Sequence, residues 1–592
     1  MPRRASRSRA VLAAVLGTAL AAPLALTAPA AATTPYTVTA LKFTVQAGDR
    51  SCAIDADLYR PAGVDHDRPA PAVLATNGFG GSKDDGSTDA VGKAFARRGY
   101  VALVYSGLGF GGSGCLISLD DPEIDGRAAA RLVDFLAGDR AADDGTRAGF
   151  VTLDRAGDPR VGMIGGSYGG AVQLATAAVD RRVDALVPMI TWHDLAYSLA
   201  PNNATGARKV PGAFKWQWSN GFYLMGEGQP LLQPSLDPSR INSLACLHFT
   251  TRACETIRTL NSGRYPADRT AALLDYAHSV SPVSYLHRVR TPTLLIQGQA
   301  DTLFNLNEAT ATYRTLKARG TPVRMIWQAW GHSGGLTDPP AGELDLSRGE
   351  LETSYVGRRI LAWFDHYLRH RPVDTGPAFA YHRDWIGDPD DTYATADRLP
   401  APTTTLYLSG DGRLVDRRAK VARGSRTYTN WPLPSSHSES SLAGLLGLPD
   451  PAPYDTAGTH LAWTGEPLTR AVTVVGAPSV TLKVASPRAE RTQDSGDAAD
   501  KLVLFAKLYD VAPDGGSTLV HRLVAPVRVP DVTEPFTVTL PGLVHRYEPG
   551  HRLRFVVAAS DDAYFGNRGV KPVTVVSAPD DTGVLRLPVT AG

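Results

Sequence analysis

The chain has 592 residues, of which 43 % are hydrophobic and 20 % are charged. This balance is typical of a globular protein of about two to four domains, and it excludes a disordered chain, a coiled coil and a collagen-like repeat. The formal net charge of +2 gives no electrostatic reason to expect binding to nucleic acid or to an anionic membrane surface.

Residues 1–32 have the pattern of a secretory signal peptide. Four arginines and no acidic residue are followed by an Ala/Leu-rich run over Ala10–Leu26 and by small residues at Ala30–Ala32. The alternative is a membrane anchor, but the run is short and Pro23 interrupts it. The Arg3–Arg4 pair also permits the twin-arginine export route. No later apolar stretch reaches the length of a membrane span, so we expect a secreted protein with no stable membrane insertion.

The four cysteines predict two disulfides, because an even number in an oxidising compartment is typical of such bridges. Three pairings are possible, and we favour Cys246–Cys254, which closes a short loop and leaves Cys52 with Cys115. Neither a C-x-x-C motif nor a histidine-rich spacing indicates a metal, so none is expected.

The central region predicts strands and helices in alternation. This order is typical of a mostly parallel sheet with helices on both faces, in which sites form at the carboxyl ends of the strands. The expected strands are 72–76, 100–105, 160–164, 185–190, 293–297 and 323–327, and the expected helices are 91–98, 124–136, 171–178 and 355–368.

The motif Gly165-Gly166-Ser167-Tyr168-Gly169 matches G-x-S-x-G between a predicted strand and a helix of small residues. A glycine-rich turn with an uninvolved serine is the alternative, but the strand–turn–helix context favours the nucleophile elbow of an α/β-hydrolase. A serine hydroxyl is a poor nucleophile at neutral pH and needs a neighbouring base. We therefore predict Ser167 as the catalytic nucleophile.

The other two members of a triad are expected after the serine, in the order acid then histidine. Asp301 follows a predicted strand, and His332 lies on a Gly-flanked loop after the next one. Their competitors are less suitable, because no strand precedes Asp338 and His366 lies inside a predicted helix. His332 would be the general base and Asp301 would orient it.

Backbone N–H groups are the expected oxyanion donors. One is that of Tyr168, directly after the nucleophile, and the second is that of Phe79, in a glycine-rich loop after the 72–76 strand. A plain glycine turn is the alternative for that loop. Another glycine-rich stretch, 106–114, lacks the Lys-Ser/Thr ending of a phosphate-binding loop, so we interpret it as a loop that lines the site.

About a hundred residues separate the strands near 190 and 293, far more than one crossover helix needs. We predict a helical cap over the site at about residues 192–290. Glu227 and Glu255 in this segment are candidates to bind a substrate amine, with a solvated surface as the alternative. Aromatic residues of the cap are predicted to shape the acyl-side pocket, with packing of the cap core as the alternative: Trp192, Trp216, Trp218 and Phe222.

After residue 400 the pattern changes to short alternating runs separated by Gly, Pro and Asp turns, which predicts a β-sandwich. The predicted organisation is a signal peptide (1–32), an α/β-hydrolase catalytic domain (33–399) and a C-terminal β-sandwich (400–592).

This layout resembles the Xaa-Pro dipeptidyl-peptidase and cocaine-esterase family of serine hydrolases. The resemblance rests on GGSYGG at 165–170, on Gln297–Asp301, on Trp330-Gly331-His332, and on segments 405–412 and 550–554. It implies an α/β-hydrolase with a helical cap, followed by a jelly-roll domain. Known members use a tyrosine side chain as an oxyanion donor, whereas Asn77-Gly78-Phe79 stands in that region here.

The resemblance implies a dipeptidyl-peptidase of Xaa-Pro type that works through an acyl-enzyme on a small peptide, without a cofactor. The same machinery would serve a carboxylic-ester or amide hydrolase of the cocaine-esterase type. A non-catalytic binding protein on a hydrolase scaffold is a third alternative. The sequence does not indicate the oligomeric state.

Overall fold

A computed structural model describes residues 35–203, 210–232, 237–334, 336, 338–431, 433–439 and 451–590. The predicted signal peptide, residues 1–32, lies outside this described part. Among the helices that are described, none combines the length and the apolar character that crossing a membrane requires.

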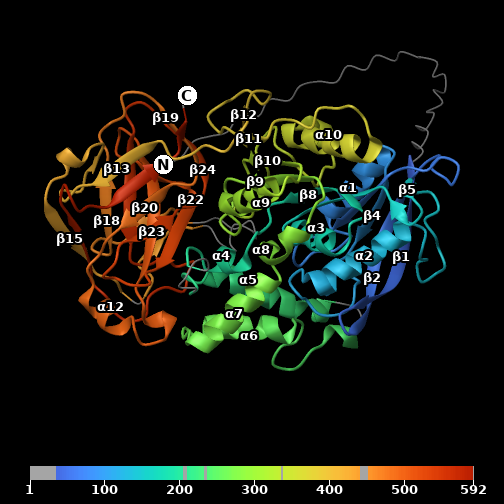
Figure 1. Ribbon diagram of the computed structural model, residues 1–592, viewed down its shortest axis with the longest axis horizontal. Helices are drawn as coiled ribbons and strands as arrows, with labels where there is room; N and C mark the ends of the chain where they lie inside the picture. Colours follow the sequence, from blue (N-terminus) through green and yellow to red (C-terminus); the bar gives the residue numbers. More distant parts are fainter. Residues whose placement is uncertain are drawn as a thin grey trace, which may run out of the picture. The chain divides into compact units, whose positions relative to one another are not determined.

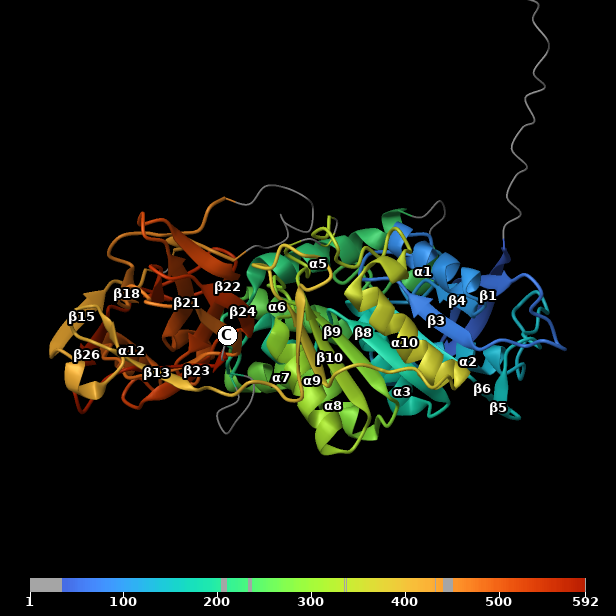
Figure 2. The ribbon, with the colours of Figure 1, turned by 90° about the horizontal axis from the view of Figure 1, so that it is seen from above.

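Ten described strands form one sheet whose central members are parallel, with antiparallel pairs at both edges. The parallel core is expected for strands that alternate with helices along the chain. The strands β8, β9 and β10 run side by side in Figure 2. In sheet order the strands are β1 (Tyr36–Ala47), β2 (Arg50–Pro61), β4 (Val101–Tyr105), β3 (Ala72–Thr76), β7 (Val161–Gly166), β8 (Val183–Met189), β9 (Thr293–Gly298), β10 (Val323–Gln328), β11 (Phe379–His382) and β12 (Tyr393–Ala396).

Helices cover both faces of this sheet because its central strands are apolar on both sides. In β3, Leu74 packs into one hydrophobic cluster and Val73 into another. The Leu74 cluster contains side chains of α2 (Arg127–Leu136), α3 (Tyr168–Val179) and α9 (Leu306–Ala318), and the Val73 cluster contains those of α1 (Gly86–Arg97) and α10 (Tyr355–Arg369). The structure is therefore an α/β-hydrolase fold in this part of the chain.

The segment between β8 and β9 is helical, and its helices α5, α6 and α7 appear together in green in Figure 1. Its α-helices are α4 (Leu195–Leu199), α5 (Trp216–Gly228), α6 (Thr251–Asn261), α7 (Ala267–Ser279) and α8 (Pro282–Tyr285). Short 3-10 turns at Gln229–Leu232, Pro238–Arg240 and Leu286–Arg288 link them. We call this segment the cap.

The residues after β12 form a β-rich part, orange to red in Figure 1, whose named strands pair antiparallel. Its core gathers large side chains such as Trp463, Phe555 and Tyr547. The larger sheets have the orders β14 (Leu414–Val415), β13 (Thr404–Leu408), β27 (Val584–Leu587), β20 (Ser479–Leu482), β23 (Phe536–Thr539); β18 (His460–Thr464), β25 (Arg552–Ala558), β21 (Val503–Val511), β22 (Ser517–Arg528); and β24 (Leu543–Tyr547), β19 (Val472–Gly476), β28 (Val589–Thr590). The smaller elements are β5 (Leu153–Arg155) with β6 (Asp158–Pro159), β15 (Gly424–Tyr428) with β26 (Val573–Ser577), β16 (Ser436–His437) with β17 (Tyr454–Asp455), and α12 (Pro487–Thr492).

A buried arginine joins the β-rich part to the cap. Arg528, only 1 % exposed at the end of β22, donates to the carbonyl oxygens of Pro211 at 2.9 Å, Gly212 at 3.0 Å and Ala498 at 3.1 Å. Such a guanidinium is costly to bury unless its donors are satisfied, so the Pro211 and Gly212 carbonyls, which precede α5, hold this part of the cap against β22.

Both predicted disulfides are present. Cys52 of β2 is bonded to Cys115, 63 residues away, and Cys246 is bonded to Cys254, 8 residues away. The first bridge ties β2, the strand next to the edge strand β1, to the loop after β4, and the second closes a short loop at the start of α6.

The two bridges should stabilise the fold unequally. Replacing Cys52 and Cys115 by alanine removes a 63-residue loop closure, which we expect to lower the unfolding free energy by about 4 kcal/mol in the chain-entropy account. The same double replacement at Cys246 and Cys254, 8 residues apart, should cost about 2–3 kcal/mol. Denaturant titration of the two purified variants measures the difference, and a larger loss for the second pair would contradict this ranking.

Candidate active site

Ser167 occupies a strained turn between β7 and α3. Its backbone has φ 56° and ψ −118°, a left-handed conformation that is unusual for any residue but glycine. The turn is possible because its neighbours have no side chains: a Cβ at Gly165 would lie 2.6 Å from the carbonyl oxygen of Gly169, and one at Gly169 would lie 2.5 Å from that of Thr76. The strand and helix therefore pack close enough to raise the serine above the sheet, as in a nucleophile elbow.

Ser167, His332 and Asp301 form one hydrogen-bonded relay. The Ser167 hydroxyl lies 2.9 Å from Nε2 of His332, and Nδ1 of His332 lies 2.7 Å from Oδ2 of Asp301. An ionised carboxylate can only accept, so it holds a proton on Nδ1 and leaves Nε2 to accept from the serine hydroxyl. This is the arrangement that general-base activation of a serine requires.

The sheet topology brings these residues together. Asp301 follows β9 and His332 follows β10, and the two strands are adjacent and parallel, so their carboxyl ends meet at one edge. Asp301 has no solvent exposure and His332 only 3 %. The ring of Phe304 packs edge-on against the imidazole at 5.2 Å between centroids, which keeps water from that face.

The backbone of the Asp301 turn also serves the carboxylate. The second oxygen of Asp301 accepts hydrogen bonds from the backbone N–H groups of Leu303 at 3.0 Å and Phe304 at 2.8 Å. Three donors therefore surround the buried carboxylate when the imidazole N–H is counted, and together they fix its plane.

The expected oxyanion donors lie beside the serine. A Cβ on Gly78 would be 4.0 Å from Cβ of Ser167, so the loop that carries Phe79 runs directly past the nucleophile. Asn77 holds this loop in place, because its side chain accepts from the Gly107 N–H at 2.9 Å and donates to the Gly78 carbonyl at 2.7 Å. The Tyr168 N–H is in the first turn of α3, where backbone N–H groups lack an acceptor within the helix, and the Phe79 N–H lies in the adjacent loop. Their role as donors remains a prediction.

Two cavities meet at Ser167. The larger, of about 470 Å³, includes His332, the first turn of α1 and the 344–347 loop in its wall. The smaller, of about 130 Å³, lies under the cap, and Ser167, Phe79 and Phe222 line both. Of the described residues that line the smaller cavity none is ionisable at neutral pH, and the set includes Trp192, Tyr223, Phe249, Tyr276, Leu303 and Phe304.

The structure separates the four aromatic residues that were predicted for the pocket. Trp192 and Phe222 line the small cavity. The pocket prediction is wrong for Trp216, because its side chain is 45 % exposed at the start of α5 and lines neither cavity. Trp218 also lines neither cavity: it is completely buried, stacks on Phe222 with a centroid distance of 5.6 Å and donates to Thr302 Oγ1 at 3.3 Å.

Several lining residues were missed. Phe249 and Tyr276 come from separate parts of the cap, and no local pattern marks them. Leu303 and Phe304 had a usable signal, because they follow Asp301 directly and the chain must leave that residue along the edge of the site.

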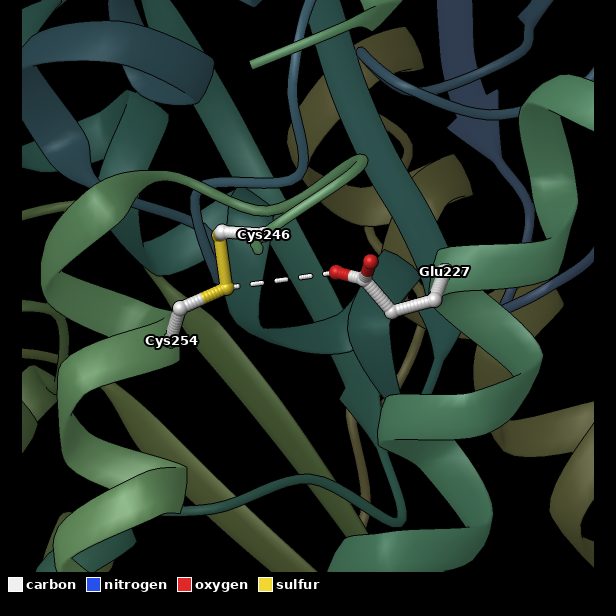
Figure 3. A group of neighbouring side chains, drawn as sticks. All are labelled: Glu227, Cys246 and Cys254. Atoms are coloured by element: carbon white, nitrogen blue, oxygen red, sulfur yellow. Dashed lines mark hydrogen bonds between the residues drawn. A yellow bond between two sulfur atoms is a disulfide. The ribbon is translucent and has the colours of Figure 1, made fainter. Parts of the chain in front are cut away.

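The two acidic residues considered for amine binding lie outside both cavities. Glu227 accepts from the Leu247 N–H at 2.6 Å, and its Oε1 lies 3.9 Å from Cys254 Sγ (Figure 3). Although Glu227 and the two cysteines are close enough together to resemble a metal site, both sulfurs belong to the disulfide and offer no thiolate. Glu255 is exposed on α6.

Two family models match this chain. The model described as X-Pro dipeptidyl-peptidase (S15 family) matches residues 49–334, and the model described as X-Pro dipeptidyl-peptidase C-terminal non-catalytic domain matches residues 385–575. The chain belongs to the X-Pro dipeptidyl-peptidase S15 family.

Curated relatives occur in Mycobacterium bovis and Mycobacterium tuberculosis. Each is 24 % identical over 333 residues and is provisionally named a serine esterase. The match covers 48 % of this chain and 48 % of each relative, so the chain spans about half the length of the curated relatives it matches.

Solved structures share the fold of this chain along most of its length. An α-amino acid ester hydrolase has a TM-score of 0.62 at 17 % identity, covering 96 % of this chain and 99 % of its own. An aminopeptidase from a Thaumarchaeota archaeon has a TM-score of 0.61 at 15 % identity, with 94 % and 97 % covered. A CocE/NonD family hydrolase from Staphylococcus aureus has 0.59 at 14 %, with 93 % and 97 % covered. These likenesses show a shared α/β-hydrolase and β-rich architecture.

A buried glutamate holds the loop that carries Trp192. Glu308 of α9 accepts from the backbone N–H groups of His193 at 2.7 Å and Asp194 at 3.1 Å, and it bonds the Ser198 hydroxyl. Burial raises the pKa of Glu308 from 4.5 to about 8. Since Ser198 donates to the Asp194 carbonyl at 3.1 Å, a protonated Glu308 can donate to Ser198 while its other oxygen accepts both N–H groups.

This pKa predicts a stability that falls as the pH rises. The folded state keeps a proton that the unfolded chain releases, so between pH 4.5 and about 8 Glu308 should lower the unfolding free energy by at most about 1.4 kcal/mol per pH unit. Glu308→Gln keeps a donor and an acceptor but does not titrate. In urea titrations from pH 5 to 9, the wild type should lose stability relative to Glu308→Gln, and a constant difference would refute the prediction.

Proposed function

We propose that the chain is an exported serine hydrolase that works through an acyl-enzyme on Ser167. The observation that carries the proposal is the relay from Ser167 through His332 to Asp301, with distances of 2.9 and 2.7 Å. The strained elbow and the burial of the acid support it, because both hold the reacting groups before a substrate arrives.

The proposed reaction has two halves. Ser167 Oγ attacks the acyl carbon while its proton passes to Nε2 of His332, and Asp301 stabilises the imidazolium. The N–H groups of Phe79 and Tyr168 receive the negative charge that develops on the carbonyl oxygen. His332 then protonates the leaving group, and a water molecule, activated by the same imidazole, releases the acyl group from the serine.

The two cavities suit different halves of the substrate. His332 must reach the leaving group to protonate it, and it lines the cavity of about 470 Å³ but not the smaller one. The acyl group therefore belongs in the cavity of about 130 Å³ under the cap. Apolar cavities of roughly 150 Å³ bind molecules the size of benzene, so one aromatic or branched acyl group fits there.

The lining of the small cavity favours an uncharged acyl group. A dipeptidyl-peptidase must bind the free ammonium of its substrate, and a buried ammonium without a carboxylate partner is costly. No described residue of this lining supplies a carboxylate. The ester or amide hydrolase is therefore the function that the geometry supports best, and the family description supports the Xaa-Pro dipeptidyl-peptidase as the second candidate.

Export is part of the proposal. The signal-peptide pattern of residues 1–32 supports it, and the two disulfides are consistent with folding in an oxidising compartment.

Ser167→Ala should abolish turnover while the fold remains. The remaining rate should be lower by at least about 1,000-fold, because binding and oxyanion stabilisation alone cannot supply a nucleophile. Initial rates on a p-nitrophenyl ester measure this, and circular dichroism checks the fold. A fluorophosphonate probe should label the wild type at Ser167 and leave the variant unlabelled. An unlabelled, inactive wild type would instead favour a binding protein on a hydrolase scaffold.

Two substrates that differ by one charge can separate the candidates. The p-nitrophenyl esters of phenylacetic acid and phenylglycine share the ring and the leaving group, and only the second carries an α-ammonium. After correction for uncatalysed hydrolysis, we expect kcat/KM to favour the phenylacetyl ester by at least about 100-fold, because the ammonium would be buried unpaired. A preference for the phenylglycyl ester, together with cleavage of an Ala-Pro anilide, would support the dipeptidyl-peptidase.

A further inference from the structure

A lysine is buried at the start of α5, close to the proposed catalytic acid. The Lys215 side chain is 2 % exposed, and its backbone N–H donates to the Leu199 carbonyl at 2.8 Å. Burying an ammonium is costly unless acceptors surround it, so its partners explain why it is there.

Those partners include the backbone of the Asp301 turn. The Lys215 ammonium donates to the Thr302 carbonyl and, at 3.2 Å, to the Leu303 carbonyl. On the opposite side of the same peptide groups, the Leu303 and Phe304 N–H groups bind Asp301. The ammonium therefore polarises the turn toward the carboxylate, because a hydrogen bond to a carbonyl strengthens the donor N–H of the same peptide unit.

A buried carboxyl group from the β-rich part of the chain lies beside this lysine. Glu439 Oε1 lies 3.6 Å from Lys215 Nζ, and the Glu439 side chain is also 2 % exposed. Burial raises the pKa of Glu439 to about 8, and the neighbouring ammonium acts against this rise. The pair thus spans two segments that lie more than two hundred residues apart in the sequence.

Backbone hydrogen bonds join the same two segments next to this pair. The Phe565 N–H donates to the Phe214 carbonyl at 2.7 Å, and the Gln217 N–H donates to the Ala563 carbonyl at 3.2 Å. Residues on both sides of Lys215 are therefore bonded to one loop of the β-rich part, which limits how far the ammonium can move.

We propose that Lys215 and Glu439 are positioning residues, through which the β-rich part holds the Asp301 turn in its catalytic geometry. The proposal rests on the proposed role of Asp301. Neither residue lines either of the two cavities at Ser167, so neither is expected to touch the substrate. Their effect should appear in kcat and leave KM unchanged, since a misplaced acid weakens the relay without changing the binding walls.

The test compares Lys215→Met with Lys571→Met. Lys571 is also buried, and its ammonium donates to the Arg568 carbonyl within the β-rich part, so its replacement matches the loss of a buried ammonium without touching the turn. We expect Lys215→Met to lower kcat and the rate of fluorophosphonate labelling by about 10- to 100-fold, because displacing a catalytic group by about 1 Å has such effects. Lys571→Met should lower the melting temperature but keep the wild-type kcat below it.

A second comparison shows whether the effect passes through Asp301. In an Asp301→Asn background, Lys215→Met should change kcat by less than about twofold, because the two substitutions disable the same relay. If Lys215→Met does not fold, Glu439→Ala removes the carboxyl group beside the ammonium and should lower kcat in the same direction, and a folded Glu439→Ala with wild-type kcat would then overturn the proposal. A folded Lys215→Met with wild-type kcat would overturn the proposal. Failure of the proposed function gives a different result, since the wild type would then be neither active nor labelled at Ser167.

Discussion

A carboxylate without solvent exposure places the strongest demand on this structure. A buried carboxylate needs donors that replace the water it has lost, and the donors of Asp301 are the imidazole of His332 and two backbone N–H groups of its own turn. The imidazole can serve only if β9 and β10 end side by side, and the N–H groups only if the turn keeps its shape. The burial of this one carboxylate therefore requires both the sheet order and the turn contacts.

In the proposed reaction the cap has a different task, which is to exclude water from the acyl side of Ser167. Its residues Phe222, Tyr223, Phe249 and Tyr276 line a small cavity without charges. Such a lining gives the proposed acyl group an apolar environment, in which the oxyanion donors act more strongly than in water. The disulfide between Cys246 and Cys254 closes the loop that carries Phe249.

The residues of the relay could be found from the sequence because their signals are local. Ser167 lies in a motif whose glycines are required by contacts as close as 2.5 Å, and Asp301 and His332 each follow a short apolar strand. The pocket could not be found in this way. Trp216 and Trp218 are two residues apart on α5, yet one is exposed and the other is buried, and neither lines a cavity. Tertiary packing decides which face of a cap helix is directed to the site, and the amino-acid composition of the segment does not predict it.

The β-rich part reaches the site through buried polar groups, and this is an expensive way to join two segments. Arg528 and the pair of Lys215 with Glu439 each bury charge where apolar side chains would be at least as stable. Apolar contacts, however, are non-directional, whereas an ammonium bonded to two carbonyl groups sets both distance and orientation. A joint that only had to be strong would not need such groups. The presence of Lys215 beside the Asp301 turn favours a joint whose geometry matters, so under the proposed function the β-rich part is a frame for the catalytic acid and not an appendage.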